Sequence, residues 1–334
     1  MSSETDSYIM DVLLSLPHQS VAGSFGFSFW NRHRTFLISL CNCSSMYQTL
    51  AQTVLPVFLI IVLGYAIGKV RKIEVQTFVD LIVYVAAPCL IFASISRSDI
   101  NLSDFTTLAG AALAVILIMM TASFLILRLF GSEKTGLYLP LVFGNTSYLG
   151  YPVALFAFGM DGLSRAVVYD MMNSLVIFSL GIYVVSHRNE LLEAFKLPLL
   201  YAVLIGLAVN LLHLPVPDVL FRPVEMIGMI TIPLALLVLG YKLTEIRISA
   251  AKLAVAASLF RICGGFAVAL AVSTLLSLDG MVRNILLLQA AMPSAVMGMI
   301  LTAKYDRDAS LVASVVLITT VMGVVSIPLI LMIL

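Results

Sequence analysis

From residue 50 to its end, the chain alternates long apolar runs with short polar connectors. A transmembrane helix needs about 20 mostly apolar residues. Because lipid offers no hydrogen bonds to the backbone, runs of this length cross a bilayer as helices. We therefore predict an all-α integral membrane protein with ten transmembrane helices, at residues 50–68, 77–96, 106–130, 137–159, 165–186, 197–213, 222–241, 250–277, 283–303 and 309–333.

The composition agrees with a lipid bilayer as the environment of this chain. Of the residues, 61% are hydrophobic and 11% are charged, whereas about a quarter of the residues of a soluble domain are charged. Nineteen Lys and Arg residues against eighteen Asp and Glu residues leave a net charge of +1. That balance creates no overall field to attract nucleic acid, so we expect no nucleic-acid partner.

Catalytic and metal-binding motifs are absent from the sequence. It contains no HExxH, no P-loop and no Gly-rich nucleotide motif after a strand. The four cysteines form no CxxC pair and have no His residues at the spacing of a zinc site. We therefore expect a protein that is not an enzyme and that has neither a metal site nor a bound cofactor.

Residues 1–45 differ from the rest of the chain. They hold Trp30, the only Trp, and no apolar stretch of about 18 residues. No small-residue cleavage site follows a basic start. We expect Met46 to be the natural start, with residues 1–45 a wrongly assigned or dispensable extension.

Basic residues are distributed unevenly between alternate connectors. Loops that face the cytoplasm carry an excess of Lys and Arg. One set of connectors holds twelve basic residues and the other set four. We therefore predict a multi-pass protein of the cell (plasma or inner) membrane, with both termini outside and the central connector in the cytoplasm. The twelve are Lys69, Arg71, Lys72, Arg128, Lys134, Arg188, Lys196, Lys242, Arg247, Lys252, Lys304 and Arg307, and the four are Arg97, Arg165, Arg222 and Arg283.

Proline positions indicate that the chain is an inverted duplication. Pro88 and Pro233 are 145 residues apart, and Pro152 and Pro293 are 141 apart. Five helices per half would place the second half upside down relative to the first, a recurrent design of transporters. The predicted divisions are a first repeat at 46–186, a connector at 187–196 and a second repeat at 197–334.

The fourth and ninth predicted helices carry helix-breaking residues in mid-membrane. The fourth reads FGNTSYLGYPVA from Phe143 to Ala154, and the ninth reads QAAMPSAVMG from Gln289 to Gly298. Proline removes a backbone donor and glycine relaxes the helix. One such helix alone is equally well explained as a kink that improves packing. Two at corresponding positions favour a polar pocket inside the membrane, because the freed peptide groups need partners.

The half-helices beside two such breaks would direct their N-termini at a bound anion. Neutral side chains near the breaks would orient that ligand by hydrogen bonds. Asn145 and Gln289 are the first candidates. The other predicted site residues at the breaks are Ser147, Tyr148, Gly150, Pro152, Pro293 and Ser294.

Arg261 lies about ten residues into the eighth predicted helix. A charge at that depth is costly and usually faces a cavity or a partner, so Arg261 is a further candidate for anion binding. An equally weighted alternative is that it extends to the membrane surface or pairs with a carbonyl. Asp170, Asn173 and Asp80 are weaker candidates, expected to cap helices or face loops. No acidic residue adjoins either break, which argues against sodium/proton antiport.

Three segments resemble the auxin efflux carrier family, whose bacterial members include malonate and malate carriers and whose plant members export auxin. They read GNTSYLGYP (Gly144–Pro152), IPLALLVLGYKL (Ile232–Leu243) and QAAMPSAVMGMILTAKYDRD (Gln289–Asp308). The resemblance implies a fold like that of bile acid symporters and sodium/proton antiporters, with Pro152 and Pro293 at the helix crossover. It also implies a scaffold of helices one, two, six and seven, often dimeric, and a moving domain of the other six. The short central loop resembles that of bacterial members.

Together these features predict a secondary transporter that moves a small organic anion, such as a mono- or dicarboxylate or an auxin-like acid, by alternating access. A homodimer is an expected assembly. Two alternatives stay open: a sodium-coupled symporter of bile-acid type, and a non-transporting ligand sensor.

Overall fold

The computed structural model of the chain describes residues 50–129, 135–186 and 198–334. In these ranges the secondary structure is helical, and the one β-type pairing is an isolated bridge between Gly144 and Ser294. The predicted extension 1–45 and connector 187–196 lie outside the described residues. The α-helices are α3 (Leu55–Val70), α4 (Val75–Leu81), α5 (Ala87–Ser96), α6 (Leu102–Leu129), α7 (Tyr138–Val142), α8 (Gly150–Val176), α9 (Ile182–Ser186), α10 (Pro198–Leu211), α11 (Asp218–Met229), α12 (Thr231–Leu243), α13 (Ala251–Leu259), α14 (Gly265–Leu275), α15 (Gly280–Ala290), α16 (Val296–Lys304) and α17 (Ala309–Ile333).

Several of these helices are joined end to end by π-helical turns, which often occur at functional sites. Pro88 follows one of them, and its missing N–H interrupts the regular α-helical ladder there. The π-helical turns are η1 (Leu50–Val54) before α3, η2 (Ile82–Ala86) between α4 and α5, η4 (Ile177–Gly181) between α8 and α9, and η6 (Phe260–Gly264) between α13 and α14.

Within the described ranges, seven helical segments are long and apolar enough to cross a bilayer. This confirms an integral membrane protein built of helices, while the expected number of long helices was ten. The difference has local causes: the fourth and ninth predicted helices are each divided by a break, and α10, at 14 residues, is short. The seven segments are Gln52–Val70, Val75–Ser96, Leu102–Leu129, Gly150–Val185, Asp218–Leu243, Ala251–Leu275 and Ala309–Ile333.

One of the seven segments changes direction at Gly159. The helical segment Gly150–Val185 has 36 residues, which would measure about 54 Å if straight, against a hydrocarbon core about 30 Å thick. Gly159 has φ 66° and ψ −160°, outside the helical region. Because a left-handed φ of this kind favours glycine, this residue allows the chain to turn near the predicted boundary between the fourth and fifth helices.

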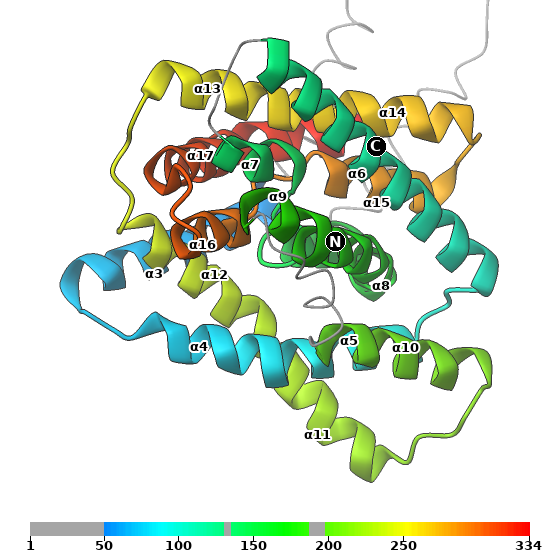
Figure 1. The fold of residues 1–334 in the computed structure, drawn as a ribbon. Helices are drawn as coiled ribbons and strands as arrows, with labels where there is room; N and C mark the ends of the chain where they lie inside the picture. Colours follow the sequence, from blue (N-terminus) through cyan, green and yellow to red (C-terminus); the bar gives the residue numbers. More distant parts are fainter. Residues whose placement is uncertain (1–49, 130–134, 187–197) are drawn as a thin grey trace, which may run out of the picture. The chain divides into compact units, whose positions relative to one another are not determined.

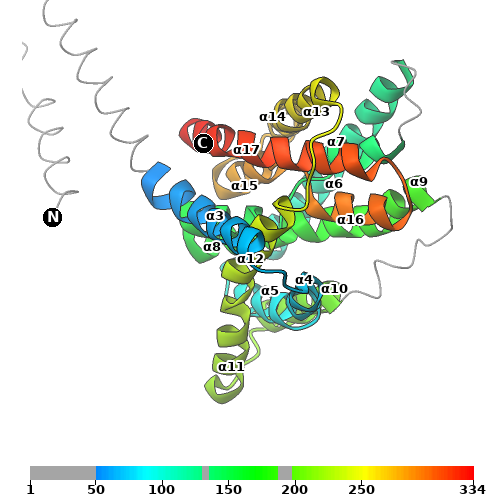
Figure 2. The same ribbon diagram turned by 90° about the vertical axis from the view of Figure 1, so that its left-hand side faces the viewer.

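The helices fall into two groups by their contacts, as Figures 1 and 2 show. In the first group α3 packs on α12, and α5 packs on α10 and α11. In the second group α8 packs on α6 and α15, α14 packs on α6 and α15, and α17 packs on α13 and α16. We name these the scaffold group (η1, α3–α5 and α10–α12) and the crossing group (α6–α9 and α13–α17). The scaffold group contains the predicted helices one, two, six and seven.

Close backbone approach joins α3 to α12 in the scaffold group. A Cβ atom added at Gly64 would overlap the backbone of Leu237, and one added at Gly240 would overlap the carbonyl of Ile61. Small residues allow membrane helices to approach in this way. The two helices are therefore held together by direct backbone contact.

Connectors that were predicted on the same membrane side contact one another. Arg97 forms an ion pair with Asp218 at 2.9 Å, and both lie at ends predicted to be outside. At the opposite ends, the N–H of Ile73 donates to the hydroxyl of Tyr241 at 2.9 Å.

Candidate functional site

Two helices of the crossing group are interrupted where the sequence predicted. α7 ends at Val142 and α8 begins at Gly150, while α15 ends at Ala290 and α16 begins at Val296. The non-helical connections between them are residues 143–149 and 291–295. Glycine, asparagine and proline in these segments prevent a continuous helix from forming.

The two connections pair with each other through their backbones. Gly144 and Ser294 face each other as an antiparallel bridge. The N–H of Asn145 donates to the carbonyl of Pro293 at 2.6 Å, and the N–H of Ala295 donates to the carbonyl of Phe143 at 2.9 Å. Some of the peptide groups that the breaks free from helical hydrogen bonds therefore bond to the other connection. These bonds hold two segments that are far apart in sequence together at one crossing.

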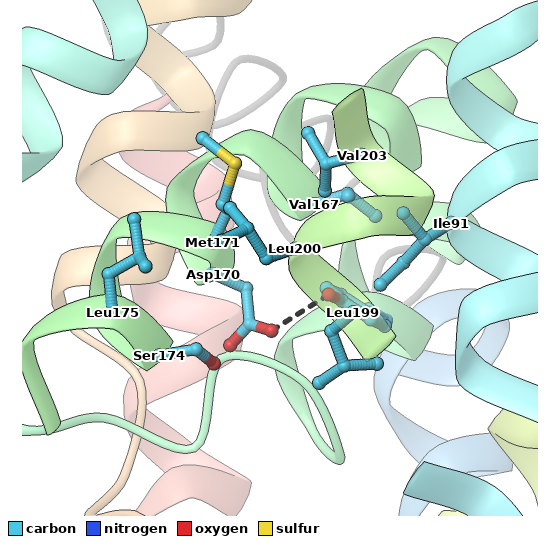
Figure 3. A pocket seen from close by; sticks show the side chains of 10 residues that line it. Ile91, Val167, Asp170, Met171, Ser174, Leu175, Leu199, Leu200 and Val203 are labelled. Carbon is cyan, nitrogen blue, oxygen red and sulfur yellow. Dashed lines mark hydrogen bonds between the residues drawn. The ribbon is translucent and has the colours of Figure 1, made fainter. Parts of the chain in front are cut away.

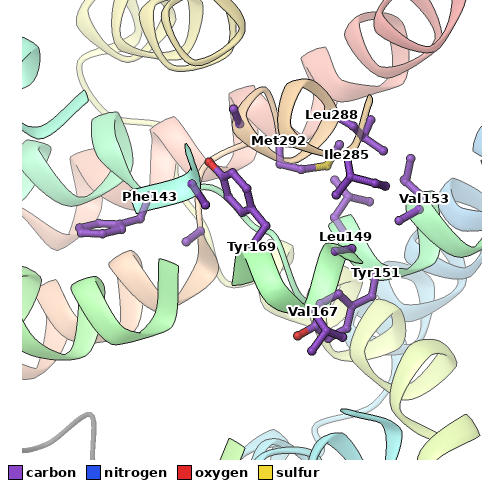
Figure 4. Close-up of a cluster of buried hydrophobic side chains, with 14 of the residues drawn as sticks. Phe143, Leu149, Tyr151, Val153, Val167, Tyr169, Ile285, Leu288 and Met292 are labelled. Atoms are coloured by element: carbon purple, nitrogen blue, oxygen red, sulfur yellow. The ribbon is translucent and has the colours of Figure 1, made fainter. Parts of the chain in front are cut away.

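Apolar side chains surround this crossing. Figure 4 shows Leu149 and Val153 from the α8 side together with Ile285, Leu288 and Met292 from the α15 side, all of them buried. Hydrogen bonds and charges act more strongly in such a low-dielectric setting than in water. A polar group without a hydrogen-bond partner here therefore lowers the stability of the folded protein.

The two predicted crossover prolines occupy different places. Pro293 lies in the second connection, and its carbonyl accepts the hydrogen bond from Asn145. Pro152 lies in the first turn of α8, just after the first connection. A proline in a first turn costs little, because the first helical N–H groups have no intrahelical acceptor.

Ser294 is a structural member of the crossing. Its hydroxyl donates to the carbonyl of Pro140 at 2.8 Å, and its N–H donates to the hydroxyl of Thr319 at 3.1 Å. These bonds tie the second connection to α7 and α17. The hydroxyl proton of Ser294 is therefore already used within the protein.

Asn145 and Gln289 present buried amides without partners at the crossing. The Nδ2 atom of Asn145 and both amide atoms of Gln289 are buried and form no hydrogen bond. The Gln289 amide lies against the start of α8, because a Cβ at Gly150 would overlap it. Buried polar groups in folded proteins are normally satisfied, so these amides are candidates for binding a polar ligand.

Arg261 extends into the same crossing from η6. Its side chain is 2% exposed, and hypothetical Cβ atoms at Gly144 and Gly265 would both meet its guanidinium. Its Nε atom is buried without a partner, and no ion pair to Arg261 occurs within the described ranges. Arg261 is therefore buried at the crossing and does not extend to the protein surface.

Ser147 and Tyr148 are the two half-buried residues of the first connection. Ser147 is half-buried, and its carbonyl accepts from the N–H of Tyr151 at 3.3 Å. Tyr148 reaches across to the scaffold group, where its ring packs on a cluster of α4, η2 and α12 that includes Val79 and Val238. The hydroxyl of Tyr148 is buried and has no hydrogen bond.

Asp170 and Asn173 correct two expectations, because both are buried beside the first connection rather than capping helices or facing loops. Asp170 accepts hydrogen bonds from the hydroxyls of Thr146 and Tyr151. Asn173 donates to Thr146 Oγ1 at 3.0 Å and to the carbonyl of Gly144 at 3.3 Å. An acidic residue therefore does adjoin a break. Asp80 is exposed and accepts from Gln76 on its own helix, as expected of a surface residue.

Thr146 and Tyr151 belong to this polar network although they were not among the predicted site residues. The sequence does contain a signal for the network: Asp170 and Asn173 are three residues apart, so they share a helix face, within an apolar segment where polar residues usually serve a function. The described ranges contain no group of three or more His, Cys, Asp or Glu side chains that could hold a metal ion.

Comparison with known proteins identifies the family. The sequence matches the family described as membrane transport protein over residues 49–194 and 182–331. It is 30% identical over 291 residues to an uncharacterised transporter of Methanocaldococcus jannaschii, covering 80% of this chain and 93% of that protein. An uncharacterised transporter of Methanothermobacter thermautotrophicus is 31% identical over 293 residues, covering 83% and 96%. The chain is thus a multi-pass membrane protein that belongs to this transporter family, of auxin efflux carrier type.

Proposed function

We propose that this protein is a secondary transporter that binds a small organic anion at the crossing of its two broken helices. The observation that carries this proposal is the set of unpartnered buried atoms there: Nδ2 of Asn145, both amide atoms of Gln289 and Nε of Arg261. Together they offer a cation and neutral donors, which is the chemistry that a carboxylate needs.

The charge of Arg261 is the main argument for an anion. An unpaired buried cation is strongly unfavourable, and a carboxylate ligand would supply the missing countercharge. The N-terminus of α8 adds a favourable dipole, since it begins at Gly150 beside the Gln289 amide. A mono- or dicarboxylate of the malonate, malate, pyruvate or indole-3-acetate kind carries the negative charge that would pair with Arg261.

The two helix groups suggest how the site would be exposed on alternate sides. The crossing group carries all the proposed ligand residues, while Tyr148 and α8 contact the scaffold group. A displacement of the crossing group along the scaffold group would carry the anion across the membrane. We also propose the ten-crossing, inverted-repeat topology, which the same-side contacts of Arg97 with Asp218 and of Ile73 with Tyr241 support.

The scaffold group is the proposed site of homodimer formation. Its helix α11 leaves Val219, Leu220 and Met226 strongly exposed, so either lipid or a second copy must cover them. Native mass spectrometry of the protein in detergent would separate these cases.

The transport proposal is tested with purified protein in liposomes loaded with radiolabelled malonate, malate, pyruvate or indole-3-acetate. We expect one of these acids to exchange across the membrane. Asn145→Ala, Gln289→Ala and Arg261→Gln should abolish or strongly weaken exchange. Matched controls are Asn210→Ala, whose amide bonds to the Ser98 carbonyl away from the crossing, and Arg222→Gln, whose side chain is 79% exposed.

The same experiment separates the competing functions. Unchanged exchange in Asn145→Ala and Gln289→Ala would refute the site assignment. Uptake that requires a sodium gradient would favour the sodium-coupled symporter. Thermal stabilisation by one of the acids without any flux would favour the ligand sensor.

A further inference from the structure

Asp170 is a buried carboxylate that the transport site does not use. It lies in the second half of α8, is 4% exposed, and forms no ion pair within the described ranges. Taking an ionised carboxylate out of water without a cation is costly, and binding a proton removes that cost. An intramembrane ionisable residue is therefore a candidate functional site.

The hydrogen-bond network around Asp170 is compatible with both protonation states. The Nδ2 atom of Asn173 can only donate, so Thr146 Oγ1 accepts from it and is free to donate its own proton to Asp170. The Tyr151 hydroxyl lies 2.8 Å from the other carboxylate oxygen. That hydroxyl donates to a carboxylate and accepts from a carboxylic acid, so the contact survives a change of protonation.

A small cavity borders Asp170. Its volume is about 20 Å³, enough for about one water molecule. Figure 3 shows the carboxylate of Asp170 among the lining side chains, next to Ser174, with its hydrogen bond dashed. The cavity wall combines α8 of the crossing group with Ile91 of α5 and Leu199 of α10 in the scaffold group. Asp170 thus lies where the two helix groups meet.

The other titratable groups around Asp170 are mostly phenols. Tyr151 and Tyr169 lie on α8 and Tyr148 lies in the connection, and each interacts electrostatically with Asp170. The side chains that α5 and α10 contribute to the cavity are aliphatic. Gln289, which faces α8 from α15, carries no charge.

Charged groups nearby are few. Tyr169 interacts electrostatically with both Asp170 and Arg261. Arg165, further along α8, is paired with Asp161 of its own helix and with Asp104 of α6. Asp170 is therefore the acidic group within this network whose charge has no partner.

Asp170 is also linked directly to the proposed anion site. Thr146, its hydrogen-bond donor, follows Asn145 in the chain, and Asn173 bonds both Thr146 and the Gly144 carbonyl. A change in the charge of Asp170 therefore acts on the connection that presents the Asn145 amide. Without ligand, the crossing group holds two buried charges that have no ion pair, the positive charge of Arg261 and the negative charge of Asp170. Binding a monoanion together with one proton leaves the net charge unchanged.

We propose that Asp170 binds and releases a proton in each cycle, so that the protein transports its organic anion together with one proton. This inference rests on the proposed transport function. The proton passes between Asp170 and water in the cavity, and no other bond is made or broken. Two hydroxyls and one carboxylate give few oxygen ligands for a metal cation, which favours a proton over sodium.

The test uses liposomes that contain the protein, at zero membrane potential and with the outer solution more acidic than the inner one. Pyruvate and malonate are the first probes, and malate and indole-3-acetate are further probes. One proton per anion across a gradient of about one pH unit gives about tenfold accumulation, because a tenfold ratio corresponds to that proton free energy. Asp170→Asn should lose accumulation yet retain exchange at equal pH. The control Asp161→Asn, on the same helix but more exposed, should accumulate normally, and protein-free liposomes correct for passive entry of the acid.

Several outcomes overturn the inference. Accumulation by Asp170→Asn, accumulation driven by sodium or by the reversed pH gradient, or no response of the wild type to pH would each do so. If no probe exchanges in the wild type, the transport proposal fails instead. Infrared spectroscopy then still tests whether Asp170 binds a proton. The wild type should then show a protonated carboxyl band that titrates between acidic and alkaline buffer and is missing from Asp170→Asn; absence of that band in the wild type refutes the site.

Discussion

The side-chain amide of Gln289 lies directly against Gly150, the first residue of α8, with no room for a Cβ between them. The obstructing atoms belong to the far end of a flexible side chain, so Gly150→Ala would displace the Gln289 amide without unfolding the protein. Losing its hydrogen bonds to the anion should cost about 1–2 kcal/mol, or about tenfold in apparent KM for exchange. Liposome exchange kinetics and thermal unfolding in detergent measure the two effects.

A double-mutant cycle isolates this contact. If Gly150→Ala acts through the Gln289 amide, it should add little further loss of exchange in a Gln289→Ala background. Additive losses would show instead that Gly150 acts on the anion site through the backbone of α8.

Ser294→Ala should lower stability rather than substrate affinity. The hydroxyl of Ser294 donates to the Pro140 carbonyl across the crossing, and removing it leaves that buried carbonyl without this donor, at about 1–3 kcal/mol. Ser258→Ala is the control, because the Ser258 hydroxyl bonds mainly to Ala254 of its own helix. A larger fall in the thermal unfolding temperature for Ser294→Ala than for Ser258→Ala is expected; equal falls would contradict a bridging role.

The breaks were predictable from sequence because their cause is local. Glycine and proline in residues 143–154 and 289–298 disfavour a regular helix through the backbone itself, and the structure interrupts both helices there. Asn145 and Gln289 could be singled out for the same reason, as amides beside a break. Ser294 has the same sequence context but is satisfied by Pro140 and Thr319, which only the fold reveals.

Asp170 was assigned wrongly because its partners are distant in sequence. Its hydrogen bond to Thr146 depends on how α8 folds back beyond the turn at Gly159, where the glycine adopts a positive φ. A linear hydropathy pattern places Asp170 near a helix end and cannot show that a connection packs on it. The depth of Arg261 was evident from its position, whereas its orientation toward Gly144 depends on packing.

Contact between α3 and α12 makes Gly240 intolerant of a side chain. A Cβ there would overlap the Ile61 carbonyl and approach the Tyr65 N–H, and backbone atoms cannot move as cheaply as a side chain. Gly240→Ala should therefore destabilise the protein by about 1–3 kcal/mol, the usual cost of overpacking. At Gly110 of α6 nothing lies within 4 Å of an added Cβ, so Gly110→Ala should leave the thermal unfolding temperature unchanged or slightly raised. Equal effects of the two substitutions would argue against direct backbone contact.

The proposed ten-crossing topology predicts which exposed residues face outward. In a background with all native cysteines replaced, Asp99→Cys lies on a predicted outer connector and Asp306→Cys on a predicted cytoplasmic one, and both positions are exposed. A membrane-impermeant maleimide added to intact cells should label Asp99→Cys directly and Asp306→Cys only after permeabilisation. Labelling of both from the same side would disprove the predicted number of crossings between them.

Arg261→Gln separates a binding role from a structural one by the sign of its effect on stability. A buried charge without an ion pair destabilises the folded protein, so replacing it with a neutral side chain of similar length should keep or raise the unfolding temperature of the substrate-free protein. The same change removes the countercharge for the anion and should abolish exchange and ligand-induced stabilisation. If Arg261 were instead a structural cation, Arg261→Gln would lower stability, as breaking a buried charge pair does. Loss of exchange together with an unchanged or higher unfolding temperature would therefore identify Arg261 as an anion-binding residue and not as a structural cation.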